Sequence, residues 1–361
     1  MQFLFIFILV IASVTLPADE GMWEPYQMSE LKNEVRQAGF RRNINSISSP
    51  FEYPMNAIVS LGGCSASFVS PNGLIATNYH CIEGSYLQYN SSQENNLFET
   101  GFVARSLDEE KRSAPGARVY ITLSSSDITE KVLAGISDTT ENSQRANIIE
   151  ANRKNIINAC ETSAEIECRV RSFFSGETFK LEKVRVIKDV RLVYAPPASI
   201  GEYGGEIDNW MYPRHTGDFA LLRAYVSADG TSQEFNTANV PYASKNYLKI
   251  SARGVDEGDF VMVLGYPGRT NRLLTMNEID YDLTVGFQGV VDYLEQGIAL
   301  IDEHTNQEDG SALKYRGTKS GYENYYKKIS GQIDGAENFQ LLQYEQANWN
   351  KFLTFVAVSY T

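Results

Sequence analysis

A short hairpin enclosed by two cysteines constrains this chain more than any other stretch. Residues 62–81 read GGCSASFVSPNGLIATNYHC, and the Ser-Pro-Asn-Gly run between two strand-like segments is a strong hairpin signal. His80 directly precedes the second cysteine, Cys81. A disulfide joining the ends of the hairpin, from Cys64 to Cys81, would hold the imidazole rigidly, as a general base requires. The alternative is a half-buried histidine that only satisfies a local hydrogen bond.

Strand-like and helical patterns divide the rest of the chain. Apolar positions with helical spacing within 127–170 predict a helical insertion between strands. From residue 272 to 361 the pattern is helical, with many polar positions and no strand alternation. Further strand-like runs occur at residues 117–125, 184–195, 218–226, 246–250 and 259–265. We therefore expect a mainly β region with inserted helices, followed by a helical region.

The first residues are strongly apolar and short. The stretch from Met1 to Leu16 is shorter than a membrane span, and Ala18 suits cleavage by a signal peptidase. We expect residues 1–18 to be a signal peptide and the protein to be exported to the periplasm or cell envelope. An uncleaved membrane anchor is the alternative, since Lys and Arg are missing from this stretch. No later stretch predicts stable membrane insertion.

Charge and cysteine content exclude several kinds of partner. The 361 residues carry a formal charge of -13, with 45 acidic against 32 basic residues and no basic run to follow a phosphate backbone. Nucleic acid is therefore not an expected partner.

Four cysteines behind an export signal favour two disulfides, and local pairs are the economical choice: Cys64 with Cys81 and Cys160 with Cys168. With three histidines in the chain, neither a zinc site nor another metal or cofactor is expected.

A second candidate position is Asp218. It follows Gly217 and opens the apolar run Phe219-Ala220-Leu221-Leu222, so its carboxylate is expected to be partly buried. Burying a charge costs several kcal/mol unless it is hydrogen-bonded or paired. An imidazole Nδ1–H, such as that of His80, would offset this cost by donating a hydrogen bond, and the carboxylate would in turn hold the imidazole in the tautomer needed for catalysis. The alternative is an aspartate that only caps the strand.

Taken together, these motifs resemble the S46 family of dipeptidyl-peptidases, a branch of the chymotrypsin clan. The resemblance extends over nearly the whole chain after residue 18, and its strongest motifs lie before residue 272. The matching segments are Asp19-Glu20-Gly21-Met22-Trp23, Gly63-Cys64-Ser65, Thr77-Asn78-Tyr79-His80-Cys81, Asp208-Asn209-Trp210-Met211, Pro213-Arg214-His215-Thr216-Gly217-Asp218-Phe219 and Gly265-Tyr266-Pro267-Gly268-Arg269-Thr270-Asn271-Arg272. Such long motifs in the same order are far more specific than an isolated histidine or aspartate.

The resemblance implies a fold and a division into domains. It implies a chymotrypsin-like double β-barrel, incomplete in this chain, followed by the start of an α-helical domain. Residues 19–271 would form the peptidase barrel region, which carries the histidine and aspartate of a triad. Residues 272–361 would form the incomplete helical domain. A homodimer is possible for the full-length protein.

The resemblance also implies roles for four residues. His80 would be the general base and Asp218 the carboxylate that orients it. Asn209 and Trp210 match positions that help to hold the free amino terminus of a peptide, although a tryptophan at this place is also a plausible core residue. Tyr79 departs from the family, which commonly has a histidine there.

The nucleophile is not found in the sequence. In the family it lies in a Gly-Asn-Ser-Gly-Ser type motif after the helical domain, and none of the 361 residues forms such a motif. We therefore expect the full-length protein to release dipeptides from peptides with a free N-terminus through an acyl-enzyme, and this chain alone to be inactive. One alternative is a non-catalytic peptide-binding protein of the same fold; another is an endopeptidase of the same clan.

Overall fold

The structure is a computed structural model that describes residues 22–268 and 274–359. The expected signal peptide, residues 1–18, lies outside this range. Among the described residues, no helix combines the length and the apolar character needed to cross a membrane.

The described strands form one antiparallel sheet. The strands are β1 (Ile58–Ser60), β2 (Ser65–Phe68), β3 (Leu74–Thr77), β4 (Phe102–Val103), β5 (Lys111–Arg112), β6 (Val119–Asp127), β7 (Ile166–Phe173), β8 (Thr178–Ile187), β9 (Asp189–Ala195), β10 (Ala220–Val226) and β11 (Val240–Pro241). Their order is β4-β9-β10-β3-β2-β1-β6-β8-β7, with β11 beside β10 and β5 beside β9. The mainly β architecture with inserted helices is as expected. The double barrel stays a prediction, because the pairings among the described strands do not close into a ring.

The middle of the sheet holds the main core and sets the positions of the hairpin and Asp218. In β3 and the first four residues of β10, buried and partly exposed residues alternate, as expected of strands with one face in the core, whereas the last three residues of β10 are all buried. The two strands are antiparallel neighbours, with Thr77 opposite Ala220 and Leu74 opposite Arg223. The ends of β3 and β10 that carry residues 78–80 and 218 therefore lie side by side, although about 140 residues separate them in the chain.

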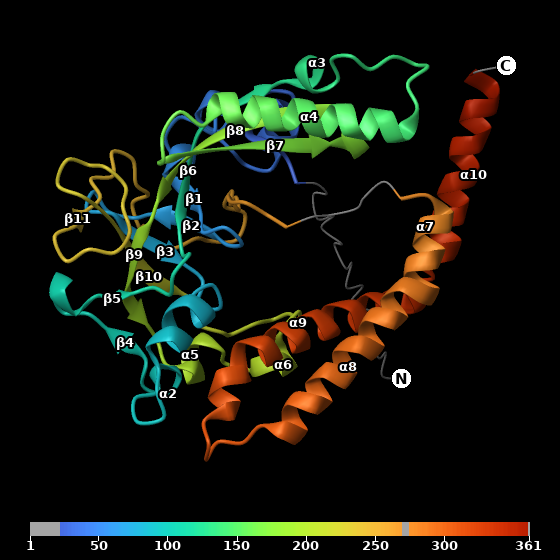
Figure 1. Cartoon of the computed structure of the whole chain (residues 1–361). Coiled ribbons are helices and arrows are strands. Elements are labelled where there is room, and N and C mark those ends of the chain that lie inside the picture. The colour runs from blue at the N-terminus through green and yellow to red at the C-terminus, as the bar shows by residue number, and fades with distance from the viewer. Residues whose placement is uncertain (1–21, 269–273, 360–361) are drawn as a thin grey trace, which may run out of the picture.

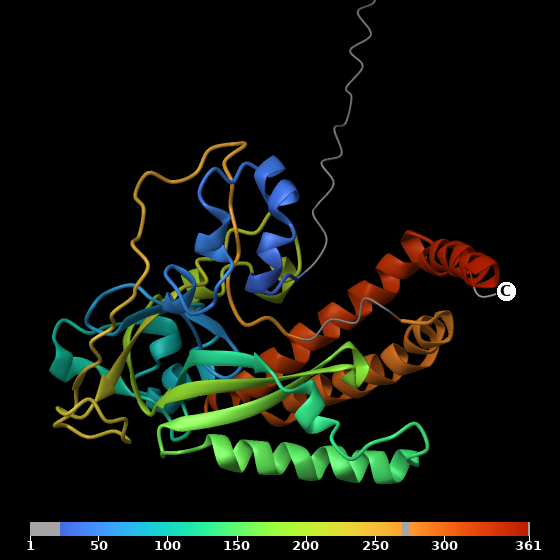
Figure 2. The same cartoon turned by 90° about the horizontal axis from the view of Figure 1, so that it is seen from above.

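Short helices fill the connections between strands. They are η1 (Pro25–Ser29), α1 (Lys32–Gln37), η2 (Ile44–Ile47), η3 (Met55–Ala57), η4 (Glu83–Gln88), α2 (Leu97–Thr100), η5 (Leu107–Glu109), α3 (Thr129–Val132), η6 (Phe174–Gly176), α5 (Ala198–Gly201) and α6 (Gly205–Asp208). The N-terminal helices have their own small apolar cluster of Met28, Phe40, Ile44 and Ile47. Figure 2 shows these helices and α4 on opposite sides of the strands.

The helical insertion expected within 127–170 is present but shorter. Its long helix, α4 (Asn142–Cys160), lies along β7 (Figures 1 and 2), and β7 already begins at Ile166. Apolar residues of α3, β7 and β8 form a second cluster beneath it, including Ile128, Val132 and Phe179.

The described residues after 274 are helical, as the sequence predicted. They form α7 (Met276–Tyr281), η7 (Asp282–Gly286), α8 (Phe287–His304), α9 (Ser311–Asn338) and α10 (Leu341–Ser359). Helix α7 begins with a capping box between Thr275 and Glu278. Helices α8 and α9 lie side by side (Figure 1), and α9 contacts η4 and α6 next to the sheet. The strand patterns at 246–250 and 259–265 were misleading, because neither segment forms a strand.

Candidate functional site

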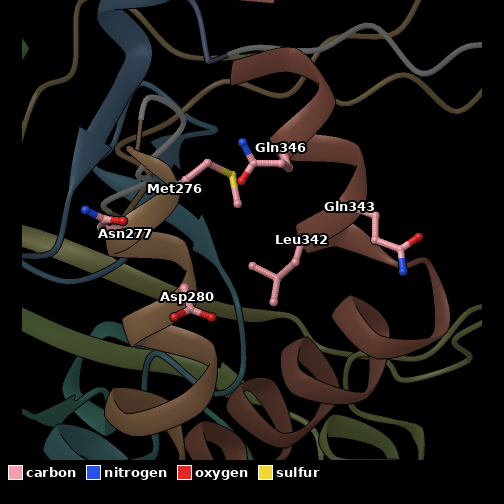
Figure 3. Close-up of a pocket in the computed structure, with 6 residues that line it drawn as sticks. All are labelled: Met276, Asn277, Asp280, Leu342, Gln343 and Gln346. Atoms are coloured by element: carbon pink, nitrogen blue, oxygen red, sulfur yellow. The ribbon is translucent and has the colours of Figure 1, made fainter. Parts of the chain in front are cut away.

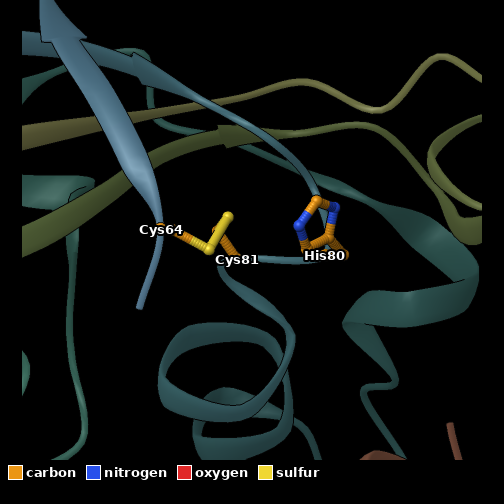
Figure 4. Close-up of side chains that lie close together, drawn as sticks. All are labelled: Cys64, His80 and Cys81. Carbon is orange, nitrogen blue, oxygen red and sulfur yellow. A yellow bond between two sulfur atoms is a disulfide. The ribbon is translucent and has the colours of Figure 1, made fainter. Parts of the chain in front are cut away.

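His80 stands at the end of the hairpin, where β3 gives way to η4. Both expected disulfides form, Cys64–Cys81 and Cys160–Cys168. The first joins the start of β2 to the residue after His80, with the two Cα atoms 6.0 Å apart (Figure 4). The hairpin therefore carries a covalent brace directly beside the imidazole, and about three-fifths of the His80 side chain (62%) remains exposed to solvent.

Asp218 lies against His80 and binds it twice. Nδ1 of His80 lies 2.9 Å from Oδ2 of Asp218, and the backbone N–H of His80 donates to Oδ1 at 3.1 Å. Asn78 adds a hydrogen bond from its amide nitrogen to Oδ2, at 3.1 Å. Because an ionised carboxylate only accepts, Nδ1 carries the proton of the neutral imidazole and Nε2 is left as the base. No hydrogen bond occupies Nε2 within the described part of the chain.

The electrostatics of the pair follow from this contact. The hydrogen bond to Asp218 raises the pKa of His80 above its usual value, against the opposing effect of burial. Burial on its own would raise the pKa of Asp218, but the hydrogen bond and charge of His80 outweigh it and lower that pKa. Both shifts favour the imidazolium–carboxylate pair.

Asn209 and Trp210 lie in a second group, just after α6. Trp210 has φ of 58°, a left-handed conformation that is unusual for a bulky residue, and its side chain is largely exposed. Observed backbone outliers of this kind concentrate at binding and catalytic sites. The indole N–H of Trp210 donates to Oδ1 of Asn324 at 3.0 Å, and the amide of Asn209 donates to the same oxygen at 2.8 Å.

Two charged side chains orient the Asn209 amide. Its nitrogen also donates to Oε2 of Glu206 at 2.9 Å, and its oxygen accepts from Arg214 at 3.1 Å. Asn324, from α9, is a residue that sequence reasoning missed. It lies 115 residues from Asn209, in a tyrosine-rich helical stretch that carries no recognisable motif.

One group of side chains near His80 has the spacing of potential metal ligands. Cys64, Cys81 and His80 bring potential ligand atoms within 4.8 Å of one another. Because the two sulfur atoms are joined in a disulfide, they offer no thiolate to a metal ion. These three residues therefore do not suit a metal ion, and the described part of the chain holds no other such group.

One open pocket lies away from these residues, between α7 and α10. Figure 3 shows its lining of Met276, Asn277, Asp280, Leu342, Gln343 and Gln346. None of the predicted site residues belongs to it, and its open lining shows no convergence of ionisable side chains. We therefore place the candidate site at His80 and Asp218.

Comparison with known proteins shows the family to which this chain belongs. The sequence model of the family described as Peptidase S46 matches residues 18–360. The chain therefore belongs to the S46 peptidase family, as the motifs predicted.

Individual members of the family are similar over almost the whole chain. An Asp/Glu-specific dipeptidyl-peptidase of Shewanella putrefaciens is 40% identical over 348 residues, which are 96% of this chain and 47% of that protein. Dipeptidyl-peptidase 7 of Capnocytophaga gingivalis is 31% identical over 351 residues, 96% of this chain and 48% of that protein. The chain spans about half the length of the curated relatives it matches.

A solved structure shares the fold. The crystal structure of Porphyromonas endodontalis DPP11 in complex with the dipeptide Arg-Asp superposes with a TM-score of 0.84 and 27% sequence identity. The match covers 94% of this chain and 50% of that one.

Proposed function

We propose that this chain supplies the base and the amine-binding residues of a serine-type dipeptidyl-peptidase, which releases dipeptides from peptides with a free N-terminus. The observation that carries the proposal is the 2.9 Å contact between Nδ1 of His80 and Oδ2 of Asp218. Family membership and relatives named dipeptidyl-peptidases support it. In this proposal the nucleophilic serine is supplied from outside the 361 residues, and the chain alone does not hydrolyse peptides.

In the proposed mechanism, His80 carries the proton in both acylation and deacylation. Nε2 of His80 takes the proton of the serine hydroxyl as its oxygen attacks the carbonyl carbon of the second residue of the peptide. The resulting imidazolium is stabilised by Asp218 and then protonates the leaving amine, which leaves an acyl-enzyme. A water molecule, deprotonated by the same nitrogen, then attacks the acyl-enzyme, and the imidazolium returns that proton to the serine oxygen as the dipeptide leaves.

Asn209, Trp210 and Asn324 are proposed to bind the ammonium group of the substrate. Amide oxygens accept hydrogen bonds from an ammonium, and an indole face adds cation–π attraction. Their mutual hydrogen bonds hold the three side chains together without a substrate, so that little ordering is needed on binding. An anchor at a fixed distance from His80 would make the enzyme cut after the second residue.

The proposal extends to the whole protein. We propose that it is exported, that it has the double β-barrel of the chymotrypsin clan, and that residues 19–271 and 272–361 belong to its barrel and helical domains. Peptides are its substrates, and the full-length protein is proposed to form a homodimer.

The test uses the full-length protein that contains this chain. We expect His80→Ala to lower kcat by about 10⁴-fold or more, as removal of a triad histidine does. His304→Ala, at an exposed histidine near the end of α8, is the matched control and should leave kcat unchanged. Unaltered hydrolysis by His80→Ala would overturn the assignment of the base.

Substrate choice tests the amine site separately. We expect a peptide with a free N-terminus to be cleaved, and its N-acetylated form to be cleaved at least 100-fold more slowly, because a neutral amide cannot replace the ammonium. Asn209→Ala should raise KM for the free peptide. Equal cleavage of free and acetylated peptides would indicate an endopeptidase, and binding without any cleavage would indicate a peptide-binding protein.

A further inference from the structure

Arg214 connects the two groups of the candidate site and takes no part in the mechanism above. Its Nη1 atom donates to Oδ1 of Asn209 at 3.1 Å, and its Nε atom donates to Oγ1 of Thr216 at 2.9 Å. Asn209 belongs to the proposed amine site, whereas Thr216 lies two residues before Asp218. We call these two contacts the Arg214 bridge, because one side chain joins the amine site to the segment that leads to Asp218.

The chain between Asn209 and Asp218 has few contacts of its own. Residues 211–215 are all exposed, and Tyr212 is 97% exposed. Within the described part of the chain, no backbone–backbone hydrogen bond involves residues 212–216. A loop with little burial and few backbone hydrogen bonds has low local stability. The loop alone therefore does not fix the distance between the two groups.

The Thr216 end of the bridge is held by contacts with α5 and the turn that follows it. The hydroxyl of Thr216 donates to the carbonyl of Tyr203 at 2.7 Å, while its oxygen accepts from Nε of Arg214. The next residue, Gly217, donates its backbone N–H to the carbonyl of Ile200 at 2.9 Å. Thr216 is therefore a fixed point for the guanidinium.

At the other end, the Asn209 amide has partners that match one orientation only. Its nitrogen donates to Glu206 and to Asn324, and its oxygen accepts from Arg214 and from the backbone N–H of Trp210, the latter at 3.1 Å. Rotation of the amide by 180° would turn its nitrogen towards two donors and its oxygen towards two acceptors. The contact with Arg214 therefore helps to fix which way the amide points.

The shape of a guanidinium suits this bridge. Nε and Nη1 of Arg214 belong to one rigid plane, so their N–H groups point in fixed directions. Both acceptors are neutral oxygen atoms, and the geometry of the donors therefore matters more than pairing of opposite charges. A lysine has a single terminal nitrogen on a flexible stem, so it would not hold both acceptors in the same way.

We propose that Arg214 is a positioning residue that ties the Asn209 amide to the segment ending in Asp218, and thereby fixes the distance between the amine site and His80. The bridge itself does not depend on the proposed function, whereas its value for cleavage after the second residue of a peptide rests on that function. Spacing matters because a displacement of about 1 Å can lower a rate about 100-fold.

The first test measures the bridge without any catalytic activity. The full-length protein is labelled with 5-fluorotryptophan, and the 19F NMR signal of Trp210 is identified by its loss in Trp210→Phe. The Trp210 indole and the Asn209 amide donate to the same oxygen of Asn324, so a change at Asn209 alters the surroundings of the indole. We expect Arg214→Met and Thr216→Val each to displace the Trp210 signal and to leave the other tryptophan signals in place.

The second test asks whether the bridge serves the amine site. In the full-length protein, Arg214→Met should lower kcat/KM for a peptide with a free N-terminus by about 10- to 100-fold and leave the slow cleavage of its N-acetylated form almost unchanged. The ratio of the two peptides removes any effect through His80: the hydrogen bond to Asp218 raises the pKa of His80, and the charge of Arg214 opposes this rise. Thr216→Val keeps that charge and should lower the ratio as well.

Arg214→Lys separates the bridge from the charge and should lower the ratio nearly as much as Arg214→Met. Arg42→Met, at an exposed arginine before η2, is the control and should change neither the Trp210 signal nor the ratio. A Trp210 signal that Arg214→Met leaves in place would overturn the proposal. So would an Arg214→Lys protein that matches the unaltered one, or an equal loss of activity towards the two peptides.

Failure of the proposed function gives a different result. If the unaltered protein cleaved free and acetylated peptides equally, the amine site would lose its assigned role. Displacement of the Trp210 signal in Arg214→Met would still support the bridge in that case.

Discussion

At the scale of residues, the candidate site depends on the charge of Asp218 as well as on its shape. The carboxylate accepts from both nitrogen atoms of His80 that face it, the ring Nδ1 and the backbone N–H. An amide at this position would keep the volume but lose the charge, and its nitrogen would face a donor. The consequences for the histidine can be measured without a substrate.

We expect Asp218→Asn to lower the pKa of His80, because the hydrogen bond and charge that raise it are removed. The titration of the His80 resonances measures this change. Asp309→Asn, in the loop before α9, is the control. An unchanged His80 pKa in Asp218→Asn would show that the carboxylate does not govern the base.

The same contact makes stability depend on pH. Since the pKa of His80 is raised in the folded state, its contribution to stability is fully present below the unfolded value of 6.5 and is lost as the pH rises through the folded value. Asp218→Asn should flatten this decline in the free energy of unfolding. Urea unfolding at several pH values would detect it.

Sequence reasoning at this scale singled out residues that stand in a motif. It selected His80 and Asp218, which the structure brings into contact, and it named Asn209 and Trp210. It missed Asn324, because the contact joins residues 115 positions apart and the helix around Asn324 has no local signal. The burial of Glu83 beside the hairpin could not be predicted either, since glutamate is usually exposed to solvent.

At the scale of elements, α5 packs directly onto the residue before His80. A Cβ added to Gly201 would lie 2.4 Å from Cδ2 of Tyr79, whose ring is fully buried. Neither group has room to move away within a close-packed interior. The end of α5 thus approaches the hairpin closely enough to require glycine.

We expect Gly201→Ala to lower the free energy of unfolding by about 1–3 kcal/mol, the usual cost of overpacking. Gly331→Ala is the matched control, because nothing lies within 4 Å of a Cβ at that exposed position of α9. It should raise stability by about 0.5–1 kcal/mol, since alanine favours a helix over glycine. Equal effects of the two changes in urea unfolding would contradict the close packing of α5.

Elements were predictable where local pattern and tertiary pairing agree. The hairpin of β2 and β3 and the helices after residue 274 follow their patterns. Residues 246–250 and 259–265 have strand patterns but form no strand, and Ile250 and Val263 are largely or fully exposed. A strand is stabilised by cross-strand neighbours along its length. Among the described residues neither segment joins a ladder, and the segment 246–250 makes a single backbone hydrogen bond to β2, from Leu248 to the carbonyl of Phe68 at 2.8 Å. The pattern of a few residues does not show whether a partner strand will lie beside them.

At the scale of the whole molecule, polar contacts attach α9 to the sheet region. Arg316 pairs with Glu202, Gln88 donates to the carbonyl of Lys314 at 2.6 Å, and Lys327 bonds the carbonyl of Ile207 at 2.5 Å. The same helix carries Asn324 to Asn209. Together with Leu313, which packs against the main core, these bonds set where Asn324 lies in the proposed amine site.

We expect Arg316→Met to lower the free energy that holds α9 in place by about 1–3 kcal/mol. The value is below that of a fully buried pair, because the Arg316 and Glu202 side chains stay 35% and 29% exposed. Hydrogen exchange should become faster in α8 and α9 and stay unchanged in β3 and β10. Lys319→Met is the control: it breaks a pair with Asp302 inside the helical hairpin and should cost at most about 1 kcal/mol. Uniform acceleration throughout the chain would contradict a local role for Arg316.

The pairing of Thr77 with Ala220 limits how the sequence of this protein can vary during evolution. Because side chains alternate between the two faces of a strand, a slip of one residue would turn the hairpin end away from Asp218 and expose Ile75 and Leu222, which are fully buried. A deletion or insertion inside either strand would thus damage core and candidate site together. Length variation should be tolerated in the connections, and the two strands should change by substitution alone.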